Sequence, residues 1–214
     1  MDGWIYGYYV LLVICFAISL FYLQHEQVRL LAILLGISIV TEIIVELIGK
    51  DEAQPRFFIV YHFFVVLEYS LITIILRSGI TDTRLKLLME ISIYVFGCIS
   101  LAHSFIFGGW HYFPGINITI ESFLVICWCL LSFFSITPNS EASIFRHPGF
   151  WLTLAFFFYF AGSMCVNGFY NLLLASDLKS ARRLFVILNS FSNYLLYIML
   201  IKGIVCFRSP RICS

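Results

Sequence analysis

The sequence has few charged residues and few prolines, and both shortages limit what the protein is. Only 12% of its 214 residues are charged, whereas 61% are hydrophobic, and soluble globular proteins have about 25% charged residues. A water-soluble fold has too little interior to bury this much apolar surface. The five prolines lie outside the long apolar segments, so no proline interrupts a helix there. The composition therefore excludes a soluble globular protein.

Several functional signatures are also missing. The formal net charge is +1, and no run of Lys or Arg follows a phosphate backbone, so we expect no nucleic-acid partner. The seven cysteines form no CxxC pair of the kind that holds zinc. Serine-hydrolase, zinc-protease and phosphate-loop motifs are absent. Met1-Asp2-Gly3-Trp4 lacks the features of a cleaved signal peptide, so we expect the first apolar run to stay as an anchor.

What the sequence does contain is a series of apolar segments of membrane-spanning length. A helix needs about 20 apolar residues to cross the hydrocarbon core. Seven segments meet this requirement: Trp4–Leu23, Val28–Ile48, Phe57–Leu76, Lys86–Phe107, Ile116–Ile136, Gly149–Leu174 and Leu184–Cys206. The connectors between them are too short to fold alone. The sequence predicts an all-α integral membrane protein, a seven-helix bundle in the lipid bilayer with residues 1–214 as a single transmembrane domain.

The distribution of Lys and Arg predicts the orientation, because positive residues are retained on the cytoplasmic side. One side has eight of them: Arg29, Arg77, Arg84, Lys86, Arg146, Lys202, Arg208 and Arg211. The other side has five: Lys50, Arg56, Lys179, Arg182 and Arg183. This predicts an N-terminus outside and a cytoplasmic C-terminus. Aromatic residues near the segment ends, among them Tyr8 and Tyr9, fit interfacial belts.

Polar side chains inside the segments are the candidate site residues, because a charged group in hydrocarbon costs about 2.5–3.5 kcal/mol on insertion scales. Their spacing of four residues in several segments places them on one face of a helix. The candidates for a ligand site or polar pocket are Glu42, Glu46, His62, Glu68, Glu121, Asn167, Asn171, Asn189 and Asn193. No residue is assigned a catalytic role and no cofactor is indicated. If a metal is bound, its expected ligands are His62, Glu68 and Glu42.

The candidates are unevenly distributed across the membrane. In the predicted orientation most of them lie in the outer half, with Glu68 and Asn193 near the middle. The inner half has Glu90 close to the start of its helix, where water, Arg84 or Lys86 can reach it. This pattern predicts a polar cavity that opens outward, has its floor near Glu68 and is sealed by Phe, Leu and Ile.

A structural interpretation of the same residues stays open. Asparagines spaced by four residues often hydrogen-bond between helices, at about 0.6 kcal/mol each. The carboxyl groups of Glu46 and Glu121 are close enough to the segment ends to reach the headgroup region. A buried carboxylate without a partner would take up a proton, whereas a His or a metal would keep it charged.

Several stretches stand out as local motifs: Tyr61–Tyr69, His147–Trp151, Tyr159–Ser163, Asn189 and Asn193–Tyr197. Together they resemble a family of small bacterial seven-helix membrane proteins to which no activity has been assigned. The resemblance covers most of the chain and implies a multi-pass protein of the bacterial inner membrane. It supplies no substrate.

Three functions remain as alternatives. A sensor or signalling module would bind a ligand from outside and act on a cytoplasmic partner, which explains the sealed inner half. An intramembrane enzyme would use the carboxylates and His62 as metal ligands or as acid and base on a lipid-like substrate. A transporter of a small solute or ion would use Glu68 near the midplane. The sequence favours the sensor and leaves the ligand and the oligomeric state open.

Overall fold

A computed structural model describes residues 2–48, 57–106, 113–136, 144–174 and 178–208; for residues 2–6, 57, 167–174, 178–185 and 208 the description covers the backbone alone. Seven α-helices and one short 3-10 helix make up this part of the chain, which contains no strand. They are α1 (Asp2–Leu20), α2 (Glu26–Ile48), α3 (Phe57–Ser78), α4 (Thr83–Ile106), α5 (Gly115–Ser135), η2 (Ile144–Arg146), α6 (Pro148–Leu174) and α7 (Leu178–Arg208).

Six of these helices are long and apolar enough to cross a membrane. They are Glu26–Ile48, Phe58–Ser78, Thr83–Ile106, Gly115–Ser135, Pro148–Val166 and Val186–Phe207. Large apolar side chains stand exposed on the outside of the bundle, such as Phe134 at 85% and Ile106 at 74%, where lipid solvates them and water would not. In α1 the described apolar stretch, Gly7–Leu20, is shorter, so the seventh crossing and the orientation stay predictions.

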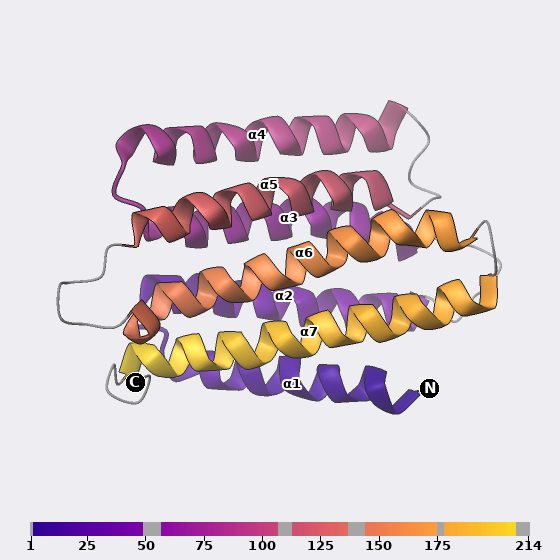
Figure 1. Cartoon of the computed structure of the whole chain (residues 1–214), viewed down its shortest axis with the longest axis horizontal. Coiled ribbons are helices and arrows are strands. Elements are labelled where there is room, and N and C mark those ends of the chain that lie inside the picture. Colours follow the sequence, from indigo (N-terminus) through magenta and orange to yellow (C-terminus); the bar gives the residue numbers. More distant parts are fainter. Residues whose placement is uncertain (1, 49–56, 107–112, 137–143, 175–177, 209–214) are drawn as a thin grey trace.

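The helices form a ring with one helix outside it. Around the ring, α1 packs on α2, α2 on α3, α3 on α5, α5 on α6 and α6 on α7, and α7 returns to α1. The remaining helix, α4, packs mainly on α3 and lies at the edge of the bundle (Figure 1). Residues from six helices can therefore face one shared interior.

Small residues set the closest approaches in this ring. A Cβ atom added at Gly162 of α6 would collide with Oγ of Ser192 on α7. A Cβ atom added at Gly7 of α1 would likewise collide with the hydroxyl of Tyr194 on α7. Such contacts between small residues and neighbouring helices are the usual means of bringing membrane helices together.

Apolar side chains fill the ring towards the C-terminal ends of α1, α3 and α7. Leu31, Ile75, Leu152 and Ile204 from α2, α3, α6 and α7 are all at most 1% exposed. Because α2 and α6 run opposite to α1, α3, α5 and α7, this half also contains the N-terminal ends of α2 and α6 (Figure 1). The polar candidates occupy the opposite half.

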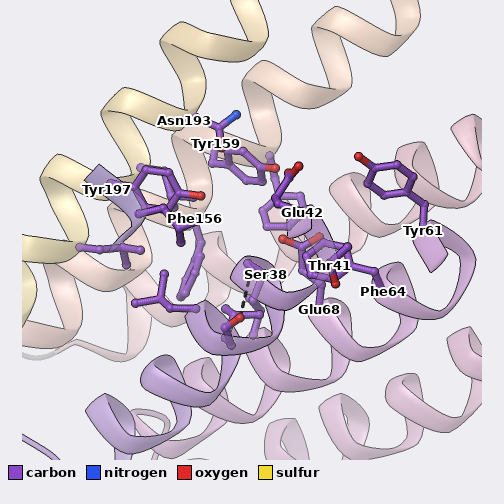
Figure 2. Close-up of a pocket in the computed structure, with 17 residues that line it drawn as sticks. Ser38, Thr41, Glu42, Tyr61, Phe64, Glu68, Phe156, Tyr159, Asn193 and Tyr197 are labelled. Atoms are coloured by element: carbon purple, nitrogen blue, oxygen red, sulfur yellow. Dashed lines mark hydrogen bonds between the residues drawn. The ribbon is translucent and has the colours of Figure 1, made fainter. Parts of the chain in front are cut away.

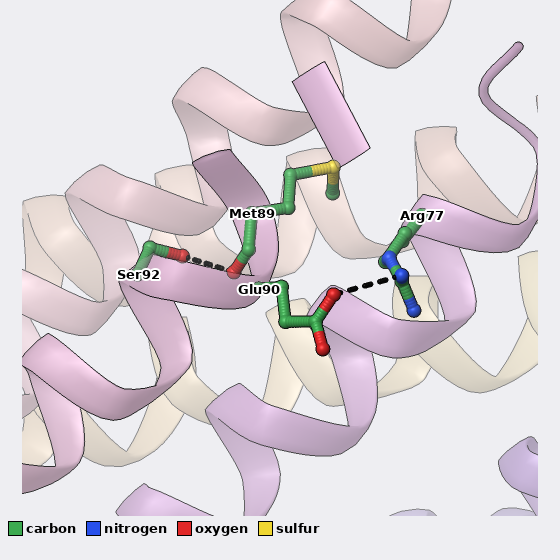
Figure 3. A network of polar contacts seen from close by, with 4 residues as sticks. All are labelled: Arg77, Met89, Glu90 and Ser92. Atoms are coloured by element: carbon green, nitrogen blue, oxygen red, sulfur yellow. Dashed lines mark hydrogen bonds and ion pairs between the residues drawn. The ribbon is translucent and has the colours of Figure 1, made fainter. Parts of the chain in front are cut away.

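The basic partner of Glu90 differs from the predicted Arg84 or Lys86. Oε2 of Glu90 lies 2.9 Å from Nη2 of Arg77 on α3 (Figure 3), while the Glu90 side chain stays 44% exposed, in keeping with the expected access to water. Glu90 is two turns beyond Thr83, the first residue of α4, and this brings it level with the last turn of α3. The pair links α3 to α4.

Candidate functional site

A cavity lies inside the ring and has two adjoining lobes. The small lobe, of about 70 Å³, is lined from α1, α2, α3, α6 and α7. The large lobe, of about 200 Å³, adds residues of α5. Both lobes share Glu42, Tyr61, Phe64, Glu68, Tyr159, Phe160 and Asn193. A single water molecule needs about 10–15 Å³, so the lobes are large enough for several waters or a small molecule.

Three carboxyl groups from three helices line this cavity. Glu42 of α2 and Glu68 of α3 line both lobes, and Glu121 of α5 lines the large one. Figure 2 shows Glu42 and Glu68 on neighbouring helices facing the labelled tyrosines. Among the described residues that line the two lobes there is no Lys, Arg or His. None of these described side chains therefore balances the negative charge that the carboxyl groups would have when ionised.

Glu121 is the most buried of the three. Only 1% of the residue is exposed, and its Oε1 atom has no hydrogen-bond partner in the described part of the chain. Buried polar atoms nearly always have a partner, and leaving one without costs about 1–3 kcal/mol. Since the side chain lines the large lobe, the atom that would satisfy Oε1 can come from a molecule in that lobe.

Tyrosines provide much of the remaining lining. Tyr61, Tyr159 and Tyr197 line the small lobe, and Tyr8 lines the large one. The hydroxyl of the neighbouring Tyr9 donates a hydrogen bond of 3.1 Å to Oε2 of Glu42. The sequence pattern indicated only that Tyr8 and Tyr9 are interfacial aromatics, and it did not predict that Tyr8 lines the cavity or that Tyr9 bonds to Glu42.

The signal that would have found Tyr8 is its helical register. Leu12, Cys15 and Ser19 follow Tyr8 at intervals of four, three and four residues, and these three are buried. This spacing defines one face of an α-helix, and it places Tyr8 on the face of α1 that is turned into the ring.

The predicted site residues on α7 line the cavity, but the hydrogen bond between them lies within that helix and does not join two helices. Asn193 lines both lobes and Asn189 lines the large one. The side-chain amide of Asn193 donates a 2.9 Å hydrogen bond to the backbone carbonyl of Asn189, which is in the same helix. The side chains of Asn167 and Asn171, predicted for the same site, lie outside the described residues.

His62 lies on the other side of α3, towards α4. Its Nδ1 is 2.7 Å from Oγ of Ser104, whose hydroxyl also lies 2.9 Å from the backbone oxygen of Ser100. Asn117 of α5 donates to the same oxygen at 3.4 Å. The six residues from His62 to Glu68 turn an α-helix through about 600°, which leaves the two side chains about 120° apart. His62 is thus not among the cavity-lining residues.

Glu46 is also outside the cavity. It lies one turn after Glu42 on a similar face of α2, but near the end of the helix, where it is exposed. Neither lobe includes it among its lining residues. Within the described ranges, no three His, Cys, Asp or Glu side chains gather closely enough to hold a metal ion, so His62, Glu42 and Glu68 do not form the ligand set that the sequence suggested.

The helices and the cavity together define the class of protein: an all-helical, multi-pass membrane protein in which a ring of helices encloses a carboxyl-lined cavity. The comparisons with known proteins find no match, whether among family models, curated proteins or solved structures. The function is therefore inferred from the chemistry of the cavity.

Proposed function

We propose that the protein is a membrane sensor module that binds a small polar molecule in the cavity and transmits a change in helix packing to a cytoplasmic partner. The observation that carries this proposal is the division of the ring interior. Carboxyl, hydroxyl and amide groups line one half, and tightly packed, mainly apolar residues fill the other, where buried hydroxyl groups such as those of Ser132 and Thr153 lie among them. A binding chamber with a closed end suits recognition better than passage.

The proposed orientation places the N-terminus outside a bacterial inner membrane and the C-terminus in the cytoplasm. Its support is the excess of Lys and Arg at the ends where α1, α3, α5 and α7 finish. In this orientation the end of the cavity near Asn189 and Glu121 is the outer one, and a ligand reaches it from outside the cell.

The closed half of the ring favours sensing over transport. Small-lobe residues beyond Glu68 are apolar, among them Leu12, Ile72 and Leu200, and all three are at most 2% exposed. A solute crossing the protein would have to lose its hydrogen bonds in this region at a cost of several kcal/mol. Moving these residues apart would require a large rearrangement of the bundle.

The cavity is too small to suit an enzyme that acts on lipid. Pockets that enclose drug-sized ligands have volumes of about 300–1,000 Å³, and both lobes are smaller than this. The described residues also bring no metal ligand set and no imidazole into the cavity. A small, soluble ligand fits the space better than an acyl chain.

Ligand-dependent thermal stabilisation tests the proposal. A ligand that binds the folded protein raises its melting temperature, by an amount that depends on concentration and affinity. We would purify the wild type, Glu68→Gln and Glu46→Gln in mild detergent and screen amines, amino acids, sugars and organic acids. The expected result is a compound that stabilises the wild type and Glu46→Gln but has little effect on Glu68→Gln. If no class of compound stabilises the wild type, the proposal is wrong.

Uptake into proteoliposomes then separates a sensor from a transporter. The stabilising compound, in radiolabelled form, should not accumulate beyond the level of empty liposomes, because the inner half of the ring is closed. Accumulation that is lost in Glu68→Gln would replace the sensor with a transporter.

A further inference from the structure

We infer that the large lobe of the cavity binds a small organic cation with a primary ammonium group, which donates a hydrogen bond to Glu121. This inference rests on the proposed function and gives its ligand a chemical class. Four features of the lobe support it: an unsatisfied acceptor, carboxyl groups without a described basic partner, the spread of these carboxyl groups over three helices, and aromatic walls.

The unsatisfied acceptor is Oε1 of Glu121. The residue is 1% exposed and lines the large lobe, and this oxygen has no partner among the described residues. Glu42, by contrast, already accepts a hydrogen bond from Tyr9. The ionised carboxylate of Glu121 can only accept hydrogen bonds, so a ligand that satisfies it must donate one; an ammonium group has three N–H donors, and its charge favours the ionised form.

The carboxyl groups of the lobe determine the sign of the charge that the ligand should have. Glu42, Glu68 and Glu121 line the large lobe, and none of its lining residues in the described part of the chain is basic. Charges in a low-dielectric environment interact strongly, because little water screens them. A cation in the lobe is attracted by the carboxyl groups, whereas an anion would be repelled and would lack any cationic partner.

The spread of the carboxyl groups distinguishes an organic cation from a metal ion. The three carboxyl groups belong to α2, α3 and α5, and the described residues contain no group of three ligands close enough for one metal ion. Metal ions require several ligands at distances of about 2.0–2.6 Å. An organic cation can hydrogen-bond to one carboxyl group and be attracted by the others at longer range.

The walls of the lobe suit the carbon part and the charge of such a ligand. Phe64, Phe113, Tyr159 and Phe160 line it together with Ile118 and Val166. Aromatic faces attract cations, most strongly where the site is desolvated. The volume of about 200 Å³ admits a compound of a few non-hydrogen atoms.

Three probes of equal carbon number test the inference: butylamine as the cation, butanol as the neutral compound and butyrate as the anion. Each is added at constant ionic strength and pH 7 to protein in mild detergent, and the melting temperature gives the apparent dissociation constant. Butylamine should stabilise the wild type more than butanol or butyrate does. In Glu121→Gln, its dissociation constant should rise by about tenfold or more, which corresponds to 1.4 kcal/mol.

Two further variants keep the test decisive. Glu68→Gln changes a carboxyl group on a different helix and should also weaken butylamine binding, so the inference does not depend on the folding of Glu121→Gln alone. Glu46→Gln lies outside the cavity and should bind butylamine as the wild type does.

The outcomes separate the inference from the proposed function. If butanol or butyrate stabilises the wild type as much as butylamine and Glu68→Gln removes that effect, the cavity is a binding site but the cationic class is wrong. Equal butylamine binding in Glu121→Gln, Glu68→Gln and the wild type would also overturn the inference. If none of the probes and none of the screened compounds stabilises the protein, the proposed function fails as well.

Discussion

The hydroxyl of Tyr9 donates a hydrogen bond of 3.1 Å to Oε2 of Glu42, and this contact joins α1 to α2 at the polar half of the ring. It is an interhelical bond to a group that also lines both lobes of the cavity. Tyr9 therefore has two roles: it stabilises the contact between two helices, and it positions one carboxyl group of the site.

We expect Tyr9→Phe to lower the free energy of unfolding by about 1 kcal/mol, because it removes one hydrogen bond and leaves the ring in place. Ligand affinity should fall too, since the Glu42 carboxyl group loses its positioning partner. SDS titration in mixed micelles measures the first effect and ligand-induced thermal shift the second. Tyr94→Phe is the control, since Tyr94 is 69% exposed on α4; an equal response of both variants would contradict the prediction.

His62 should act in stability and not in binding. It is 1% exposed and its Nδ1 contacts Ser104 of α4, so His62→Ala leaves a void and an altered polar cluster between α3 and α4. We expect a loss of about 2–4 kcal/mol in the free energy of unfolding, with ligand affinity unchanged in the folded fraction.

Ser104→Ala provides the check on the His62 contact. If the two side chains stabilise the protein through each other, the double variant His62→Ala, Ser104→Ala should lose less free energy than the sum of the single variants. A His62→Ala protein that folds as stably as the wild type but no longer binds ligand would instead return His62 to the functional site.

Two glycines allow a matched test of helix packing. At Gly162 an added Cβ atom would collide with Oγ of Ser192, whereas at Gly97 the nearest atom of another residue, Cγ1 of Val66, would be 3.6 Å away. Gly162→Ala should destabilise the protein by about 1–3 kcal/mol through overpacking of α6 on α7. Gly97→Ala should be neutral or stabilising, because alanine favours a helix over glycine by about 1 kcal/mol. The two variants are compared by SDS titration, and equal effects would show that helix propensity outweighs packing at Gly162.

The helices were largely predictable from the sequence because length and hydrophobicity determine them. The predicted segments Val28–Ile48 and Phe57–Leu76 differ by at most two residues at either end from α2, Glu26–Ile48, and α3, Phe57–Ser78. By contrast, α7 begins at Leu178, six residues before the predicted start at Leu184. A hydrophobicity scan finds the part of a helix that suits lipid, and it overlooks a polar first turn that is still helical.

The site was predictable only in part, because a sequence gives the face of a helix and not its neighbour. Glu42, Glu68 and Glu121 do line one cavity, and their unusual place in apolar segments was sufficient to select them. His62 does not line the cavity because the six residues that separate it from Glu68 place the two side chains about 120° apart around the helix. That α4 lies outside the ring depends on packing between helices, which no periodicity reveals.

The ion pair of Arg77 and Glu90 gives a final prediction about the half of the bundle opposite the cavity. The two side chains are 37% and 44% exposed, so solvent and headgroups weaken their attraction, and pairs of this kind contribute about 0.2–1 kcal/mol. Arg77→Glu alone should destabilise the contact of α3 with α4, because two carboxylates then face each other. Combining it with Glu90→Arg should restore most of the loss, since the pair is only reversed, and SDS titration of the three variants measures this. A double variant no more stable than Arg77→Glu would show that the pair depends on the fixed geometry of the guanidinium on α3, and not on opposite charge alone.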